Sequence, residues 1–138
     1  MLPSNTSAGC PPGSRLAFRV AGLVGCLAVV AIHVIDQGGI PGSKSPEYVQ
    51  GLYYILEAGG VFCAFLLLIN QAWLGWLLSL WVATGPIVGY VLSRGPGLPF
   101  YTDDIGNWTE PLGVASLVVE SALLVLSAAC LVTLITPK

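Results

Sequence analysis

Two glutamates inside apolar segments are the residues of this sequence best placed to do chemistry. Glu57 and Glu120 each lie well inside a long apolar stretch, and in a membrane helix that rises 1.5 Å per residue each would sit roughly 13–15 Å deep, near the bilayer centre. A carboxylate there is costly, so it must face the protein interior, be protonated or have a partner. The pair could handle protons or cations, or anchor a polar ligand. Equally, both could be protonated and hydrogen-bonded between helices as structural links.

The only histidine suggests a second kind of site. His33 lies three residues before Asp36, and residues with this spacing share one face of a helix. The two could form half of a site for a hard or borderline metal cation at the outer face of the membrane, with carboxylates from residues 102–110 completing it. The alternative is an interfacial histidine bonded to a carboxylate. Apart from this possible cation, we expect no cofactor.

The longest polar segment of the chain runs from residue 93 to 110. It contains Asp103, Asp104, Asn107 and Trp108. Long polar loops in compact proteins are often functional. We expect these four residues to contact a partner protein or a cation.

The composition indicates the elements that hold these residues. Of 138 residues, 55% are hydrophobic and only 9% are charged, whereas soluble domains carry roughly a quarter charged residues. The surface must therefore face lipid. We predict an all-α bundle of four transmembrane helices over residues 15–138, preceded by a disordered tail over residues 1–14, with two repeated helical hairpins as a further hypothesis. The spans are placed near 16–36, 48–69, 72–92 and 111–135, each long enough to cross a bilayer.

The charges predict an orientation and exclude one class of partner. With the N-terminus inside, Arg15, Arg19 and Lys138 are cytoplasmic, while Lys44 and Arg94 are outside. The excess of positive charge on the inner side predicts a multi-pass protein of the cell inner (plasma) membrane with both termini in the cytoplasm. A net charge of −2, with few and scattered basic residues, is not a nucleic-acid footprint.

A short internal repeat relates the two predicted hairpins. Gly39-Ile40-Pro41 resembles Gly97-Leu98-Pro99, with Asp36 and Arg94 each five residues before the proline. Two hairpins of the same orientation would be related by a pseudo-twofold axis along the membrane normal. An ion pair between Asp36 and Arg94 would then tie the two halves together.

Several motifs carry a resemblance to a known group. Ser93-Arg94, Gly97-Leu98-Pro99, the run Asp103-Asp104-Ile105-Gly106-Asn107-Trp108 and Glu120 resemble uncharacterised four-helix membrane proteins of high-GC Gram-positive bacteria. This resemblance implies the topology and a bacterial origin, and no activity. A looser likeness to DoxX-type four-helix proteins, at residues 56–60, implies an accessory role beside membrane oxidoreductases.

These observations favour a non-catalytic function. The sequence contains no phosphate-binding loop, nucleophile–base pair or dinucleotide fingerprint. We expect a small integral subunit or accessory protein of a larger membrane complex, whose partners are the bilayer and other membrane subunits. The alternative is a small oligomeric transporter or ion-handling protein that uses Glu57 and Glu120. An enzyme acting alone would need a metal at His33, Asp36 and the 93–110 segment.

Overall fold

The computed structural model describes residues 10–136, which form four long helices and one short turn. The elements are η2 (Pro12–Ser14), α1 (Leu16–Asp36), α2 (Glu47–Leu68), α3 (Ala72–Arg94) and α4 (Pro111–Ile135). Each of the four α-helices is long and apolar enough to cross a membrane. The prediction of an all-α, four-span fold is confirmed, and the chain is a multi-pass membrane protein. The largest difference in helix bounds is at α3, which continues to Arg94.

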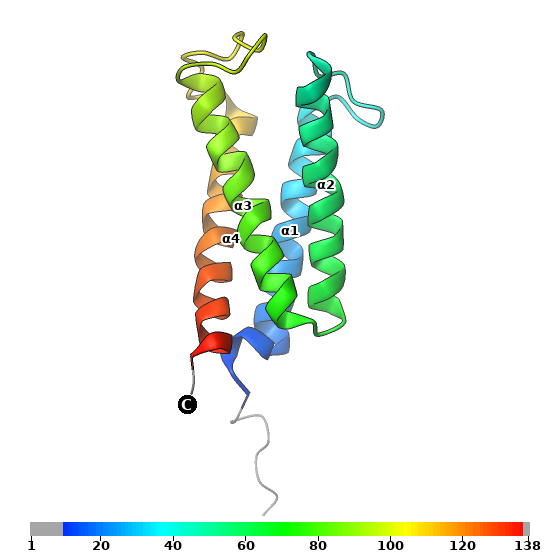
Figure 1. The fold of residues 1–138 in the computed structure, drawn as a ribbon, viewed down its shortest axis with the longest axis vertical. Helices are drawn as coiled ribbons and strands as arrows, with labels where there is room; N and C mark the ends of the chain where they lie inside the picture. The colour runs from blue at the N-terminus through cyan, green and yellow to red at the C-terminus, as the bar shows by residue number, and fades with distance from the viewer. Residues whose placement is uncertain (1–9, 137–138) are drawn as a thin grey trace, which may run out of the picture.

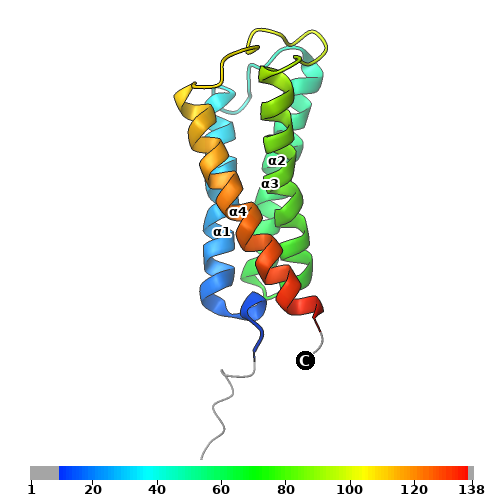
Figure 2. The same ribbon diagram turned by 90° about the vertical axis from the view of Figure 1, so that its left-hand side faces the viewer.

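The helices pack as two hairpins, α1 with α2 and α3 with α4 (Figure 1). The short link over residues 69–71 joins the hairpins at one end of the bundle, and the loops over residues 37–46 and 95–110 are both at the other end (Figure 2). We call these the turn end and the loop end. The ribbons of α2 and α3 diverge from the turn end towards the loop end (Figure 1). This divergence matters because it separates the hairpins on one side of the bundle.

The outside of the bundle is apolar, and inside it small polar side chains make contacts between helices. Ile55, Trp81 and Val125 are 72%, 67% and 70% exposed, as expected where lipid is the solvent. Inside, the Sγ atoms of Cys26 and Cys63 lie 3.1 Å apart between α1 and α2. The Oγ atoms of Ser79 and Ser127 lie 2.6 Å apart between α3 and α4. Close contacts of this kind hold membrane helices together where the hydrophobic effect does not.

The chain before α1 is more structured than the sequence predicts. Residues 1–9 of the predicted tail lie outside the described residues. Pro12–Ser14, however, form a 3-10 turn packed under the turn end. Gly13 donates its N–H to Thr133 (3.0 Å) and accepts from the indole of the buried Trp76 (2.6 Å). The tail prediction is wrong for these residues because α3 and α4 both supply hydrogen-bond partners for the Gly13 backbone.

Candidate functional site

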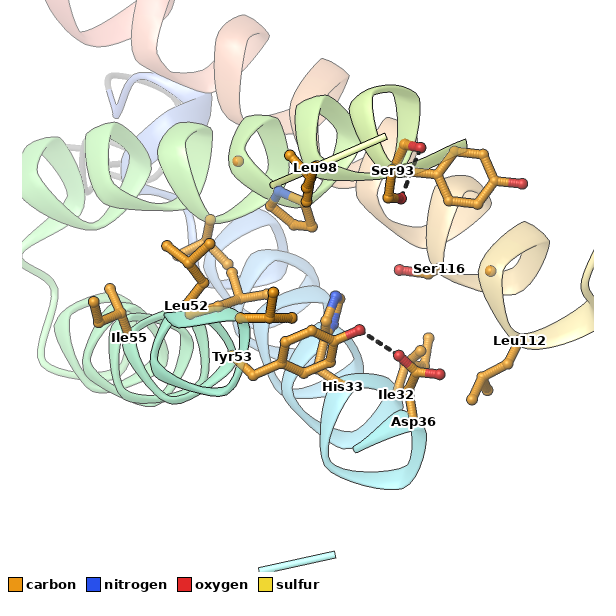
Figure 3. Close-up of a pocket in the computed structure, with 18 of the residues that line it drawn as sticks. Ile32, His33, Asp36, Leu52, Tyr53, Ile55, Ser93, Leu98, Leu112 and Ser116 are labelled. Carbon is orange, nitrogen blue, oxygen red and sulfur yellow. Dashed lines mark hydrogen bonds between the residues drawn. The ribbon is translucent and has the colours of Figure 1, made fainter. Parts of the chain in front are cut away.

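A cavity of about 400 Å³ lies between the two hairpins, in the half of the bundle nearer the loop end. All four helices contribute to its wall. Its loop end is polar, and its deeper wall is apolar and built mainly by α2 and α3. Figure 3 shows His33 and Tyr53 of the first hairpin facing Ser93 and Ser116 of the second. The polar lining comprises His33, Asp36, Tyr53, Tyr90, Ser93, Arg94, Tyr101, Glu110 and Ser116.

The cavity opens sideways between α2 and α3. Leu52 and Ile55 of α2 line the cavity and are 54% and 72% exposed. Trp81 of α3 also lines it and is 67% exposed. On α3 there is room beside this opening, because a Cβ atom built on Gly85 or Gly89 would meet no described atom within 4 Å outside its own stretch of helix. The opening therefore faces the lipid tails, and the helix next to it leaves space unfilled.

Arg94 organises the polar end on the second hairpin. Its guanidinium lies 4.1 Å from the ring centroid of Tyr90 and donates to Ser93 Oγ at 2.9 Å. Carboxylate oxygens of Asp104 and Glu110 lie 4.0 and 3.9 Å away. Glu110 is also the N-cap of α4, accepting from the first N–H groups of that helix. The positive end of the helix and the guanidinium thus neutralise the same carboxylate.

Asp36 is held within the first hairpin. Its carboxylate lies 3.2 Å from Lys44 Nζ and accepts a hydrogen bond from the Tyr53 hydroxyl. The predicted ion pair between Asp36 and Arg94 is therefore not formed within residues 10–136. Both side chains line the cavity, but each loop folds back and supplies a nearer partner of opposite charge.

His33 pairs with Glu120 instead of Asp36. Its Nδ1–H donates to the carbonyl of Val29 at 2.8 Å, and its Nε2 lies 3.7 Å from Glu120 Oε1. Glu120 is 1% exposed and accepts from the Ser116 hydroxyl. Across residues 10–136, no three His, Cys, Asp or Glu side chains cluster as metal ligands. The predicted site at His33 and Asp36 is not assembled, because Val29 occupies one ring nitrogen and Lys44 with Tyr53 occupies the carboxylate.

The two buried glutamates lie in different places. Glu120 contacts His33 and Ser116, which line the cavity between the hairpins. Glu57 is 8% exposed and lines a separate groove formed by α1 and α2, with Val30 and Phe62 among its neighbours. Its Oε1 has no hydrogen-bond partner among the described residues. Both are buried, as the sequence suggests, but no hydrogen bond joins them in this part of the chain.

The loop over residues 95–110 is held by hydrogen bonds on the side facing the helices and is exposed on its outer side. Asp104 accepts from the Tyr101 hydroxyl at 2.8 Å, and the carbonyl of Asn107 accepts from Arg94 Nε at 3.1 Å. Burial, together with this hydrogen bond to Asp104, raises the pKa of the Tyr101 phenol above its ordinary value. It therefore remains a donor at neutral pH. Asp103, Asn107 and Trp108 are exposed, whereas Asp104 is half-buried.

Several site residues were missed from the sequence. Tyr90 lies four residues before Arg94, and Ser116 lies four residues before Glu120, so helix geometry could have indicated both as neighbours of residues that the sequence singled out. Tyr53 and Tyr101 reach the cavity from separate elements and carry no local signal. Phe100, which is 93% exposed at the loop end, was also not singled out from the sequence.

Comparisons with protein-family models, curated proteins and solved structures gave no match for this chain. The functional argument therefore rests on the geometry of the cavity.

Proposed function

We propose that this chain is a non-catalytic accessory protein of a larger membrane complex, and that it takes an amphipathic molecule from the bilayer and holds it between its hairpins. The single observation that carries this proposal is the cavity, which is polar at the loop end and apolar where it opens between α2 and α3. Ligand sites are typically concave and mostly apolar, with a few polar groups that fix orientation. A molecule with a polar head and an apolar tail matches both regions.

The arrangement of the polar groups supports holding rather than reaction. Arg94 is engaged by Asp104 and Glu110, and Asp36 is engaged by Lys44 and Tyr53. Groups fixed in this way keep a rigid shape around a head group. The tail would lie against Leu52, Ile55 and Trp81 and continue into the lipid.

The exposed surface of the loop supports a partner protein. Phe100, Ile105 and Trp108 are 93%, 49% and 45% exposed, and aromatic residues are enriched in protein interfaces. Asp103, Asp104 and Asn107 lie in the same loop and give polar contacts at its edge. We place this loop on the outer side of the plasma membrane, with the termini in the cytoplasm, so the partner would bind from outside or alongside.

The alternative, an ion path that uses Glu57 and Glu120, has less support. A shared path would need both carboxylates along one cavity. Glu57 instead lines the groove of the first hairpin, and Glu120 is covered by His33 and Ser116.

The proposal is tested by purifying the chain from its own membranes in mild detergent and identifying co-purified molecules by mass spectrometry. We expect one amphipathic molecule at close to one per chain, together with a partner protein. Recovery of bulk membrane lipids only, in the proportions of the membrane, would count against the cavity as a binding site.

A further inference from the structure

The hydroxyl groups around the cavity share one property that defines the head group of the ligand. Each has already donated its proton within the chain. Tyr53 donates to Asp36, Tyr101 to Asp104 and Ser116 to Glu120. Tyr90 donates to the carbonyl of Trp108 and Ser93 to the carbonyl of Tyr90.

A hydroxyl has one proton to donate and two lone pairs that accept. Because the protons of all five lining hydroxyls are committed, the capacity left to them is acceptor capacity. The imidazole of His33 adds no donor, since its Nδ1–H donates to Val29 and its Nε2 faces Glu120. The carboxylate oxygens of Asp36 and Glu110 are acceptors too. Apart from the Arg94 guanidinium, whose Nε and Nη1 already donate to Asn107 and Ser93, the polar end of the cavity is therefore a set of acceptors.

The charges at this end give a second constraint. Three carboxylates (Asp36, Asp104 and Glu110) face two cations, Lys44 and Arg94, and the N-terminus of α4. A helix N-terminus carries roughly half a positive charge, so the cluster is close to neutral. The Arg94 guanidinium is also stacked on Tyr90 and hydrogen-bonded to Ser93 and Asn107. A phosphate head would find no unengaged cation among these groups.

We infer that the cavity binds a lipid alcohol, an uncharged lipid whose head donates an O–H hydrogen bond. This inference rests on the proposed function, because it names the class of molecule held in the same cavity. The hydroxyl lies at the acceptors contributed by Tyr53 and Asp36, and the tail leaves between Leu52 of α2 and Trp81 of α3. Prenols, diacylglycerols and quinols share this chemistry.

Lipids with acceptor-only heads fit less well. An ether, ester or quinone carbonyl cannot donate, so it would leave the acceptors of the cavity without partners after water is displaced. Leaving a buried polar group unsatisfied costs more than the net gain from a typical hydrogen bond. The indole N–H of Trp81 does not change this, because Trp81 lies on the open, exposed side of the cavity.

The experiment compares two isomers, hexadecanol and methyl pentadecyl ether, which have the same atoms and differ in the hydroxyl proton. Binding of each to the full chain in detergent is measured by native mass spectrometry. Loss of one hydrogen bond corresponds to a difference of about five- to tenfold. We expect hexadecanol to bind tighter by about this factor, and hexadecyl phosphate to bind more weakly than the alcohol.

Two variants locate the binding. Gly89→Leu fills the cavity, whereas Gly51→Leu adds the same side chain to α2 at a position not among the residues found to line it. The alcohol should bind Gly51→Leu as it binds the wild type and should bind Gly89→Leu at least about tenfold more weakly. Equal binding of alcohol and ether, both lost in Gly89→Leu, would overturn the inference and leave the proposed function standing. Tighter binding of the phosphate would also overturn it. Binding that is indifferent to Gly89→Leu would overturn both.

Discussion

His33 Nε2 lies 3.7 Å from Glu120 Oε1, so the single histidine of the chain faces the most deeply buried of its carboxyl groups. The contact joins α1 of one hairpin to α4 of the other. Because Nδ1–H donates to Val29, the neutral ring offers no proton towards Glu120. One proton between the two side chains, on either the imidazole or the carboxyl, makes the pair attractive. The two hairpins are thereby linked directly behind the cavity.

The first prediction concerns this link. Glu120→Ala should destabilise the folded protein by about 1–3 kcal/mol, because it leaves Ser116 and His33 buried without their partner. Glu120→Gln keeps an oxygen for Ser116 and should cost less. Unfolding in mixed micelles, followed by circular dichroism, measures both. Equal stability of Glu120→Ala and the wild type would show that the contact does not hold the hairpins together.

The second prediction concerns the other buried glutamate. Because Glu57 Oε1 has no partner among the described residues, Glu57→Leu removes an unsatisfied polar atom and replaces it with an apolar side chain. Burying a polar atom without a hydrogen bond is costly, so we expect its removal to be nearly neutral or stabilising. The Glu57→Leu variant of the isolated chain should therefore be at least as stable to unfolding as the wild type, in contrast to Glu120→Ala. A loss of stability as large as that of Glu120→Ala would mean that Glu57 has a stabilising partner.

The third prediction separates the two loops. Arg94→Lys keeps the charge but loses the planar stack on Tyr90 and the Nε donor to Asn107. Amide hydrogen exchange should become faster over residues 98–108 and remain unchanged over residues 38–46. Lys44→Ala should produce the reverse pattern, because Lys44 anchors only the first loop. Equal effects of either variant on both loops would contradict the assignment of separate partners.

The fourth prediction concerns the partner protein. Phe100 is 93% exposed and would be a central contact of an interface built on this loop. Phe100→Ala should reduce recovery of the partner by about tenfold or more, as expected for a binding hot spot. Its neighbour Thr102, also exposed, supplies the control as Thr102→Ala. If a triple variant with Phe100→Ala, Asp103→Ala and Trp108→Ala recovers the partner as the wild type does, the loop is not the surface that binds the partner.

The sequence predicts the helices because lipid imposes a simple rule: long apolar runs must be helical to satisfy their own backbone. It also indicates that Glu57 and Glu120 are buried. It does not predict which faces of the helices meet, because this depends on how each helix is rotated about its axis. His33 was therefore assigned to Asp36, a neighbour in sequence, although it packs against Glu120 from a distant helix.

The wrong ion pair has a similar cause. The repeated Gly-x-Pro motif placed Asp36 and Arg94 at equivalent positions, and opposite charges at equivalent positions suggested a bond. The loops that follow these residues fold back and place Lys44 beside Asp36, and Asp104 with Glu110 beside Arg94. Loop conformation depends on tertiary contacts that no short motif specifies. The docking of Gly13 under Trp76 was missed for the same reason.

The central claim is that the space between the hairpins holds an amphipathic molecule, and filling that space tests it most directly. The wild type, Gly89→Leu and Gly51→Leu are purified identically from native membranes, and the bound molecules are quantified per chain. Both substitutions replace a helical glycine with a residue of higher helix propensity, so both variants should remain folded by circular dichroism. The account predicts that Gly51→Leu retains the ligand at the wild-type level and that Gly89→Leu loses it. Equal amounts of the same molecule on all three proteins would contradict the claim.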